Sequence, residues 1–322
     1  MSNFIFSLNA IVPIILTVLL GFFLQKIGFL NDNFNKTADA FVFRCALPIS
    51  LFRSIAGMDF YGDFDLRFCL FCFVGTTVMF GGIWAASWLL LKNKGPVGAF
   101  AQASARSSAA ILGVALATNI YGDAGMVPMM IMSAVPFFNV YSVLILSFSP
   151  QVDEEGHLLP GTHGIETVKE ACVNVAKNPL ILGILAGLPF ALLRIPVPTM
   201  IDSALKSVGG TATPIALMVV GTSLCGSGAL KHWKLATVSA VVKLFLLPAI
   251  FLPIAGAMGF RDSQMIAILI MAGSPTTVAC YIMAKNMKAD SVLTANALLL
   301  STLLSAPSIT LWLCLMRLWG WI

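Results

Sequence analysis

Charged side chains are scarce in this sequence. Asp, Glu, Lys and Arg make up 10% of the 322 residues, whereas a soluble globular chain averages about 25%. Hydrophobic residues make up 58%, and the mean hydropathy is +0.92. So little charge cannot cover a water-facing surface, which excludes a soluble domain. A hydrocarbon core about 30 Å thick needs roughly 20 apolar residues per helical span, so the chain has material for about ten spans.

Residues that carry enzyme chemistry are also few. The three histidines, His157, His163 and His232, lie outside the apolar runs, and no zinc-protease, nucleophile-elbow or phosphate-loop motif occurs. Cysteines are odd in number, and Cys69 and Cys72 have no second Cys or His pair at metal spacing. Basic residues are scattered, which argues against a nucleic-acid partner. We therefore expect no metal and no cofactor, and an intramembrane enzyme is the least favoured interpretation.

The apolar runs predict an all-α polytopic membrane protein with ten transmembrane helices. The first run is too long for a signal peptide, which indicates a permanent span. A polar connection from Ser149 to Lys177 separates five spans from five. The predicted units are a first repeat at residues 1–150, a cytoplasmic linker at 151–176 and a second repeat at 177–322. The ten spans are residues 4–26, 36–55, 68–91, 97–121, 126–148, 179–193, 198–224, 235–258, 263–284 and 292–312.

The distribution of basic residues predicts the orientation. Loops after the odd-numbered spans contain ten Lys and Arg, Lys285 among them, while the other loops and the tail contain six, including Arg53. Cytoplasmic loops carry the excess of Lys and Arg. We expect a multi-pass protein of the inner (plasma) membrane with both termini extracytoplasmic.

Three matches between the two halves indicate an internal repeat. The segment starting at Pro13 parallels that starting at Pro179, and Pro48 parallels Pro214, both at an offset of 166 residues. Residues 117–120 parallel 284–287 at an offset of 167. Five spans per half is an odd number, so the second half enters the membrane in the opposite sense, as in the inverted repeats of secondary transporters. The alternative is a duplication that reflects folding history alone.

Spans 4 and 9 are the best candidates for broken helices that cross. Span 9 contains Gly-Ser-Pro-Thr-Thr at 273–277, and a proline in mid-span prevents a continuous helix. Span 4 is rich in small polar residues and continues to Gly113. Half-helix N-termini at such breaks attract anions, although small residues in span 4 also suit close helix packing. The predicted substrate-binding residues are Ser107, Ser108, Ser274, Pro275, Thr276 and Thr277.

Three basic residues fall inside the apolar spans. Arg44, Arg106 and Lys243 lie about 12 to 18 Å from the nearest cytoplasmic Lys along their helices. Only Asp39 and Asp202 are acidic residues within spans. Because buried charge is costly, at least one unmatched cation favours an anionic ligand. Snorkelling of these side chains to the interface is the alternative.

The acidic residues have predicted roles of their own. We expect Asp202 to pair with Lys206, one helical turn further on. Asp39 is expected to neutralise Arg44 or Lys243, and it is the one candidate for proton coupling. A carboxylate beside a cation is a poor proton carrier near neutral pH, so the sequence favours uncoupled movement of an anion.

Several motifs together resemble the auxin efflux carrier family. They are LPISLF at 47–52, KNPLIL at 177–182, ATPIAL at 212–217, KLFLLP at 243–248 and GSPT at 273–276. The resemblance implies ten helices in two inverted five-helix repeats, crossing broken helices in spans 4 and 9, a scaffold and a transport domain, and often a homodimer. The short central loop is similar to that of the prokaryotic branch, which is linked to malonate, malate and similar carboxylates. Span 4 departs from the pattern, because Ser108 and Gly113-Val114-Ala115 replace an Asn and a Gly-x-Pro.

The sequence thus predicts a secondary transporter in the lipid bilayer that moves a small organic anion by alternating access. Arg106 with Lys243 is expected to select a mono- or dicarboxylate. A passive anion channel or a membrane sensor is the alternative, and saturable uptake with counterflow would distinguish a carrier from both.

Overall fold

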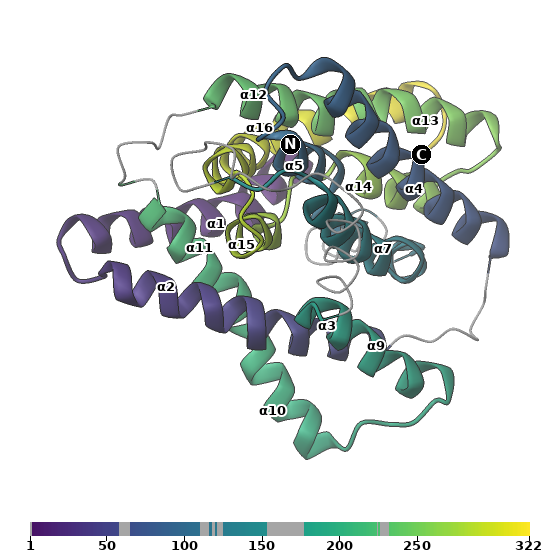
Figure 1. Ribbon diagram of the computed structural model, residues 1–322. Coiled ribbons are helices and arrows are strands. Elements are labelled where there is room, and N and C mark those ends of the chain that lie inside the picture. Colours follow the sequence, from purple (N-terminus) through teal and green to yellow (C-terminus); the bar gives the residue numbers. More distant parts are fainter. Residues whose placement is uncertain are drawn as a thin grey trace.

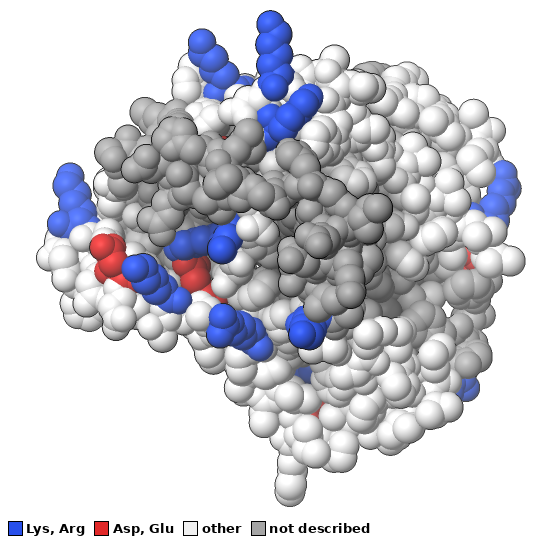
Figure 2. Space-filling model, in the orientation of Figure 1, with Lys and Arg blue, Asp and Glu red and all other residues white. Residues whose placement is uncertain are grey.

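The computed structural model describes residues 2–57, 65–109, 116–117, 120, 125–152, 177–223, 225 and 232–322. In these residues the regular structure is helical throughout, with an isolated bridge at Val152 as the one strand-like contact. Most of the expected linker, from residue 153 to 176, lies outside the described residues, as does Gly113. Figure 2 shows a surface in which charged side chains are sparse, as expected of a membrane protein.

Six helical stretches are long and apolar enough to cross a membrane. They are Leu66–Leu90, Val127–Phe148, Thr199–Thr222, Trp233–Ala257, Ser263–Asn286 and Ser291–Leu318, and they correspond to predicted spans 3, 5, 7, 8, 9 and 10. Shorter apolar helices cover Leu16–Lys26 and Pro179–Leu192. In Ser263–Asn286, 83% of an apolar 18-residue window is buried, whereas the corresponding windows of the other five stretches are 39% to 50% buried. Predicted span 9 is therefore enclosed by protein, and the other spans have a face left for lipid.

The helices pack in two groups. One group contains α1 (Ser2–Lys26), α2 (Asp32–Phe41), α3 (Leu47–Ala56), α9 (Pro179–Leu192), α10 (Thr199–Gly210) and α11 (Ala212–Ser223). The other contains α4 (Leu66–Leu90), α5 (Val97–Ala105), α7 (Val127–Phe148), α12 (Trp233–Val241), α13 (Leu247–Ala257), α14 (Ser263–Gly273), α15 (Val278–Asn286) and α16 (Ser291–Leu318). In Figure 1, α5, α14 and α15 lie between α12 and α13 on one side and α2, α3 and α9 on the other.

Equivalent residues of the two predicted repeats make reciprocal contacts in the first group. A Cβ atom added at Gly21 of α1 would lie 2.1 Å from the carbonyl oxygen of Met218 in α11. One added at Gly187 of α9 would lie 2.8 Å from the carbonyl oxygen of Phe52 in α3. The 166-residue offset pairs Gly21 with Gly187 and Phe52 with Met218, so each half packs its first span on the second span of the other half. Only glycine permits such close approach of two helix backbones.

Prolines shape two spans through π-helical turns. Val42–Ala46 and Val242–Leu246 are π-helical, and each precedes a Leu-Pro pair. Proline has no N–H, so Pro248 cannot bond the carbonyl of Leu244. Ser308 Oγ and Trp312 Nε1 of α16 donate to that oxygen at 2.8 and 2.9 Å. The second group of helices thus replaces the lost backbone bond with side chains, as a membrane interior requires.

Candidate functional site

Two predicted spans are interrupted in the middle of the second helix group. The helix α5 ends at Ala105, and residues 106–108 are not helical. The helix α14 ends at Gly273, and α15 begins at Val278 after four non-helical residues. Pro275 explains this second interruption, because it cannot donate to Met271 and it restricts the preceding Ser274 to the extended conformation found there, with φ −78° and ψ 154°.

The two interruptions lie against each other and exchange hydrogen bonds. The backbone N–H of Ser108 donates to the carbonyl of Pro275 at 2.8 Å. Gln102 Nε2 donates to the carbonyl of Cys280 at 3.1 Å. Thr276 Oγ1 bonds the carbonyl of Ala103, which has lost its helical partner because α5 ends two residues later. We call this region, residues 102–108 and 271–280, the crossing.

Lys243 lies fully buried at the crossing. Its Nζ donates to the carbonyl of Ala105 at 3.0 Å, to Ser107 Oγ and to the carbonyl of Met271 at 3.4 Å. Ser107 Oγ in turn donates to the carbonyl of Met271. The ammonium has three N–H bonds, and all three are directed to protein oxygens. Lys243 therefore has no donor left over for a ligand in this conformation.

Arg106 is buried within the crossing with its charge unmatched. Its Nη2 donates to Asn139 Oδ1 at 2.5 Å, and its Nη1 approaches Ser142 Oγ at 3.4 Å and Met283 Sδ at 3.1 Å. All these partners are neutral. Among the described residues no acidic side chain pairs with Arg106, and its Nε has no hydrogen-bond partner. The side chain is 6% exposed.

Other polar atoms at the crossing are also unpaired. Within the part of the chain that the structure describes, Gln102 Oε1, Ser274 Oγ and Thr277 Oγ1 are buried without a hydrogen-bond partner. Ser107 and Thr276, by contrast, use their hydroxyls to hold the two interruptions together. Pro275 is buried and Ser108 is half-buried. The predicted binding residues of spans 4 and 9 therefore meet at one place, and they divide into paired and unpaired groups.

Arg44 does not share this environment. It lies in the π-helical turn of predicted span 2 and is exposed, so the expectation of three buried cations holds for two residues only. Arg44 is exposed because one face of that span packs against α11 and the other lies on the surface. Exposed Arg44 resembles the snorkelling alternative.

Both intramembrane acids have partners other than those expected. Asp39 forms an ion pair with Lys285, and not with Arg44 or Lys243. Lys285, counted as a loop residue from the sequence, lies in the last turn of α15. Asp202 accepts from Arg53 Nε at 2.5 Å and from Nη2 at 2.9 Å, in place of the expected pairing with Lys206. Neither acid neutralises the crossing.

Two residues of α7 that the sequence analysis did not predict, Asn139 and Ser142, contact Arg106. Asn139 and Ser142 are three positions apart in predicted span 5, so both lie on one helix face. Both are buried, at 1% and 0% exposed. The available signal was an amide and a hydroxyl on one face of a largely apolar span.

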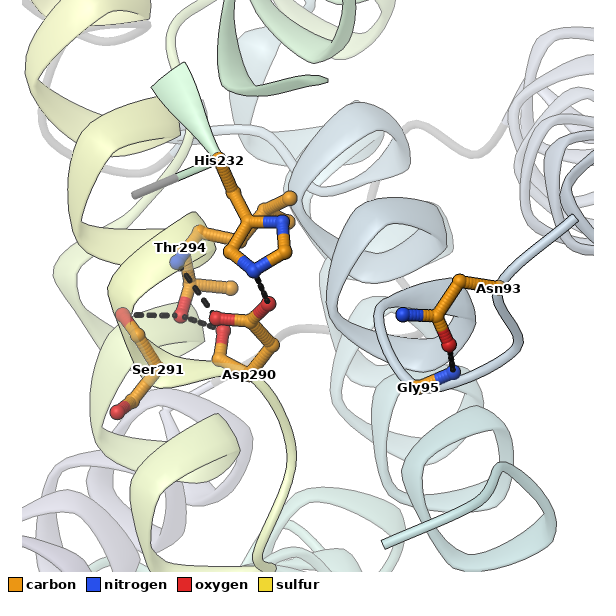
Figure 3. Close-up of polar contacts among 7 residues, drawn as sticks. Asn93, Gly95, His232, Asp290, Ser291 and Thr294 are labelled. Carbon is orange, nitrogen blue, oxygen red and sulfur yellow. Dashed lines mark hydrogen bonds and ion pairs between the residues drawn. The ribbon is translucent and has the colours of Figure 1, made fainter. Parts of the chain in front are cut away.

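A separate polar cluster lies where α16 begins. His232 Nε2 is 3.7 Å from Asp290 Oδ2, and Asp290 caps α16 by accepting from the N–H of Leu293 at 2.9 Å (Figure 3). His232 belongs to no group of three or more metal-binding side chains among the described residues. This cluster ties the start of α12 to α16.

Comparisons with known proteins agree with the membrane architecture. A family model described as "Membrane transport protein" matches residues 6–313. An uncharacterized transporter from Methanothermobacter thermautotrophicus is 24% identical over 313 residues, which cover 96% of this chain and 98% of that protein. The similarity thus extends over nearly the whole of both chains.

Proposed function

Because the chain belongs to the membrane transport protein family, the auxin efflux carrier family that its motifs indicate, we propose that it is a secondary transporter for a small organic anion. The substrate is a mono- or dicarboxylate of the malonate or malate kind, and it moves by alternating access. The binding site lies at the crossing of the interrupted spans 4 and 9.

One observation carries the substrate class. Arg106 is a buried guanidinium whose described partners are all neutral and whose Nε is unpaired. A buried charge is stable only when it is paired, and a planar carboxylate matches the guanidinium fork. Asn139 and Ser142 hold the guanidinium in place without cancelling its charge. An organic anion supplies the missing negative charge.

The unpaired hydroxyls extend the site around Arg106. Ser274 precedes Pro275, and Thr277 lies two positions after it; the carbonyl of Pro275 is bonded to Ser108, two residues from Arg106. Hydroxyl groups donate to carboxylate oxygens. We therefore assign Arg106, Ser274 and Thr277 to the ligand, and Ser107, Thr276 and Lys243 to the crossing itself.

The packing supports alternating access between two bodies. The group that contains α1, α3, α9 and α11 is the scaffold, and the group that contains the crossing moves against it. The reciprocal contacts of Gly21 with Met218 and of Gly187 with Phe52 support two inverted five-helix repeats. With ten spans, both termini are extracytoplasmic and the central linker is cytoplasmic, in line with the bias of basic residues.

Transport of the anion is uncoupled and directed outward. Moving one negative charge across 100 mV is worth roughly 2.3 kcal/mol, and the interior of a cell is negative. Asp39, the one coupling candidate, is engaged by Lys285 and lies apart from the contacts of Arg106. An uncoupled anion carrier therefore favours efflux.

Counterflow in proteoliposomes tests the carrier and its site together. Proteoliposomes that contain the wild-type protein and are loaded with unlabelled carboxylate are expected to take up labelled malonate or malate transiently, at a rate that saturates with substrate concentration. Flux that does not saturate and shows no counterflow would indicate a channel instead.

Arg106→Gln is the decisive variant, because glutamine keeps a polar side chain with two N–H donors and removes the charge. Loss of a charge-assisted bond of about 1.5–3 kcal/mol weakens binding by roughly 10- to 150-fold. Arg44→Gln is the matched control and is expected to bind as the wild type does. Wild-type affinity in a well-folded Arg106→Gln protein would refute the assignment.

A further inference from the structure

The ammonium of Lys243 lies where two half-helices end. Ala105 is the last residue of α5, and Met271 lies in the last turn of α14. Both carbonyls have lost their helical partners, since the residue four positions after Met271 is Pro275 and the chain beyond Ala105 is extended. Lys243 Nζ donates to both oxygens and to Ser107 Oγ between them.

The charges at this point balance without any acidic residue. Each helix C-terminus carries a partial charge of about −0.5, so two converging ends amount to about −1. One ammonium supplies +1. Carbonyls freed at broken helices, together with helix C-terminal ends, are the groups with which secondary transporters coordinate a coupling cation. The crossing of this protein presents those groups to a side chain.

We propose that the Lys243 ammonium occupies the position of a coupling cation, so that the carrier operates with a covalently attached cation at its crossing. This inference rests on the proposed transport function. It makes Lys243 a residue that determines ion dependence, and it explains why a fully buried lysine has carbonyl and hydroxyl oxygens, not a carboxylate, as partners. The crossing is then complete without sodium or potassium.

Removal of the side chain should create a site for a soluble cation. Lys243→Ala deletes three methylene groups and the ammonium, which together have the composition of n-propylammonium. The oxygens of Ala105, Ser107 and Met271 remain. Sodium, which these oxygens can coordinate, or n-propylammonium, which also fills the space, should bind there, while choline is too bulky.

The experiment measures the melting temperature of purified protein at constant ionic strength in sodium, lithium, n-propylammonium or choline chloride, without substrate. Wild type and Lys234→Ala, an exposed lysine on the same span, should melt at the same temperature in all four salts. Lys243→Ala should melt lower in choline and recover by about 2 °C or more in sodium, lithium or n-propylammonium. Lys243→Met, which removes the charge but fills the space, should melt alike in all four salts.

Two results would overturn the proposal. One is a sodium-specific rise in the wild type, which would mean that the crossing already binds an inorganic cation; this measurement does not depend on the folding of any variant. The other is a Lys243→Ala protein that shows no preference among the four salts. Because no substrate is present, failure here leaves the role of Arg106 unaffected, and failure of counterflow leaves this result unaffected.

Discussion

Adjacent threonines at the crossing allow a test of which hydroxyls hold the fold and which bind the ligand. Thr276 Oγ1 bonds the carbonyl of Ala103 and lies 3.3 Å from that of Arg106, and the residue is 2% exposed. Thr277 Oγ1 has no partner among the described residues. Valine has nearly the shape of threonine, so each Thr→Val change removes a hydroxyl without opening a cavity.

Opposite effects on stability are expected from the two changes. In Thr276→Val the carbonyl of Ala103 is left buried and unpaired, which costs about 1–3 kcal/mol. For a chain of this size that lowers the melting temperature by roughly 2–6 °C. Thr277→Val removes an unpaired polar atom, so the melting temperature should stay the same or rise.

Ligand binding should separate the two variants again. Loss of a hydrogen bond to a carboxylate of about 1.5 kcal/mol weakens binding roughly 10-fold in Thr277→Val. Binding is measured by calorimetry or by the concentration dependence of counterflow, and Thr276→Ser is the control that restores the bond to Ala103. Equal destabilisation by both valines, or wild-type binding by Thr277→Val, would refute the division into structural and ligand-binding hydroxyls.

Two further predictions concern the fold around the site. Lys285→Gln leaves Asp39, which is 4% exposed, without its ion-pair partner and should destabilise the protein by about 3 kcal/mol, whereas Asp39→Asn should cost less because Lys285 is one-third exposed. The double variant should be more stable than Lys285→Gln, and similar losses of stability in all three variants would contradict a specific pair. Gly221→Ala places a Cβ 2.0 Å from the carbonyl of Val18 and should cost about 1–3 kcal/mol in thermal unfolding, while Gly81→Ala, in open space on a helix, should be neutral or stabilising.

Much of the crossing was predictable because its causes are local. A proline in mid-span interrupts span 9 between α14 and α15 wherever these helices pack, and small polar residues after α5 mark the second interruption. The depth of Arg106 and Lys243 follows from counting residues along a helix. The two interruptions and the depth of these side chains depend on the neighbouring residues in the chain, so the sequence alone predicts them.

Partners across the fold were not predictable in the same way. Lys285 follows the end of predicted span 9 at residue 284 and therefore counts as a loop residue in the sequence, yet α15 continues to Asn286 and Lys285 pairs with Asp39 of α2. Arg44 counts as buried along its own helix, but its side chain is exposed in the structure. Such outcomes depend on which helices pack together, which spacing within one span does not specify.

Polar residues inside a membrane span have two possible roles, and hydrogen-bond pairing distinguishes them. In lipid every backbone group needs a partner, so each interruption of a helix recruits side chains to replace the lost bonds. Ser107, Thr276 and Lys243 serve the interruptions in this way, and a change at any of them alters the crossing before it alters the ligand. A binding site predicted from all the polar residues of a span therefore includes residues that do not contact the ligand. Atoms that stay buried and unpaired after the backbone is satisfied, such as Arg106 Nε and Thr277 Oγ1, are the ones for which we propose a bound anion as the partner.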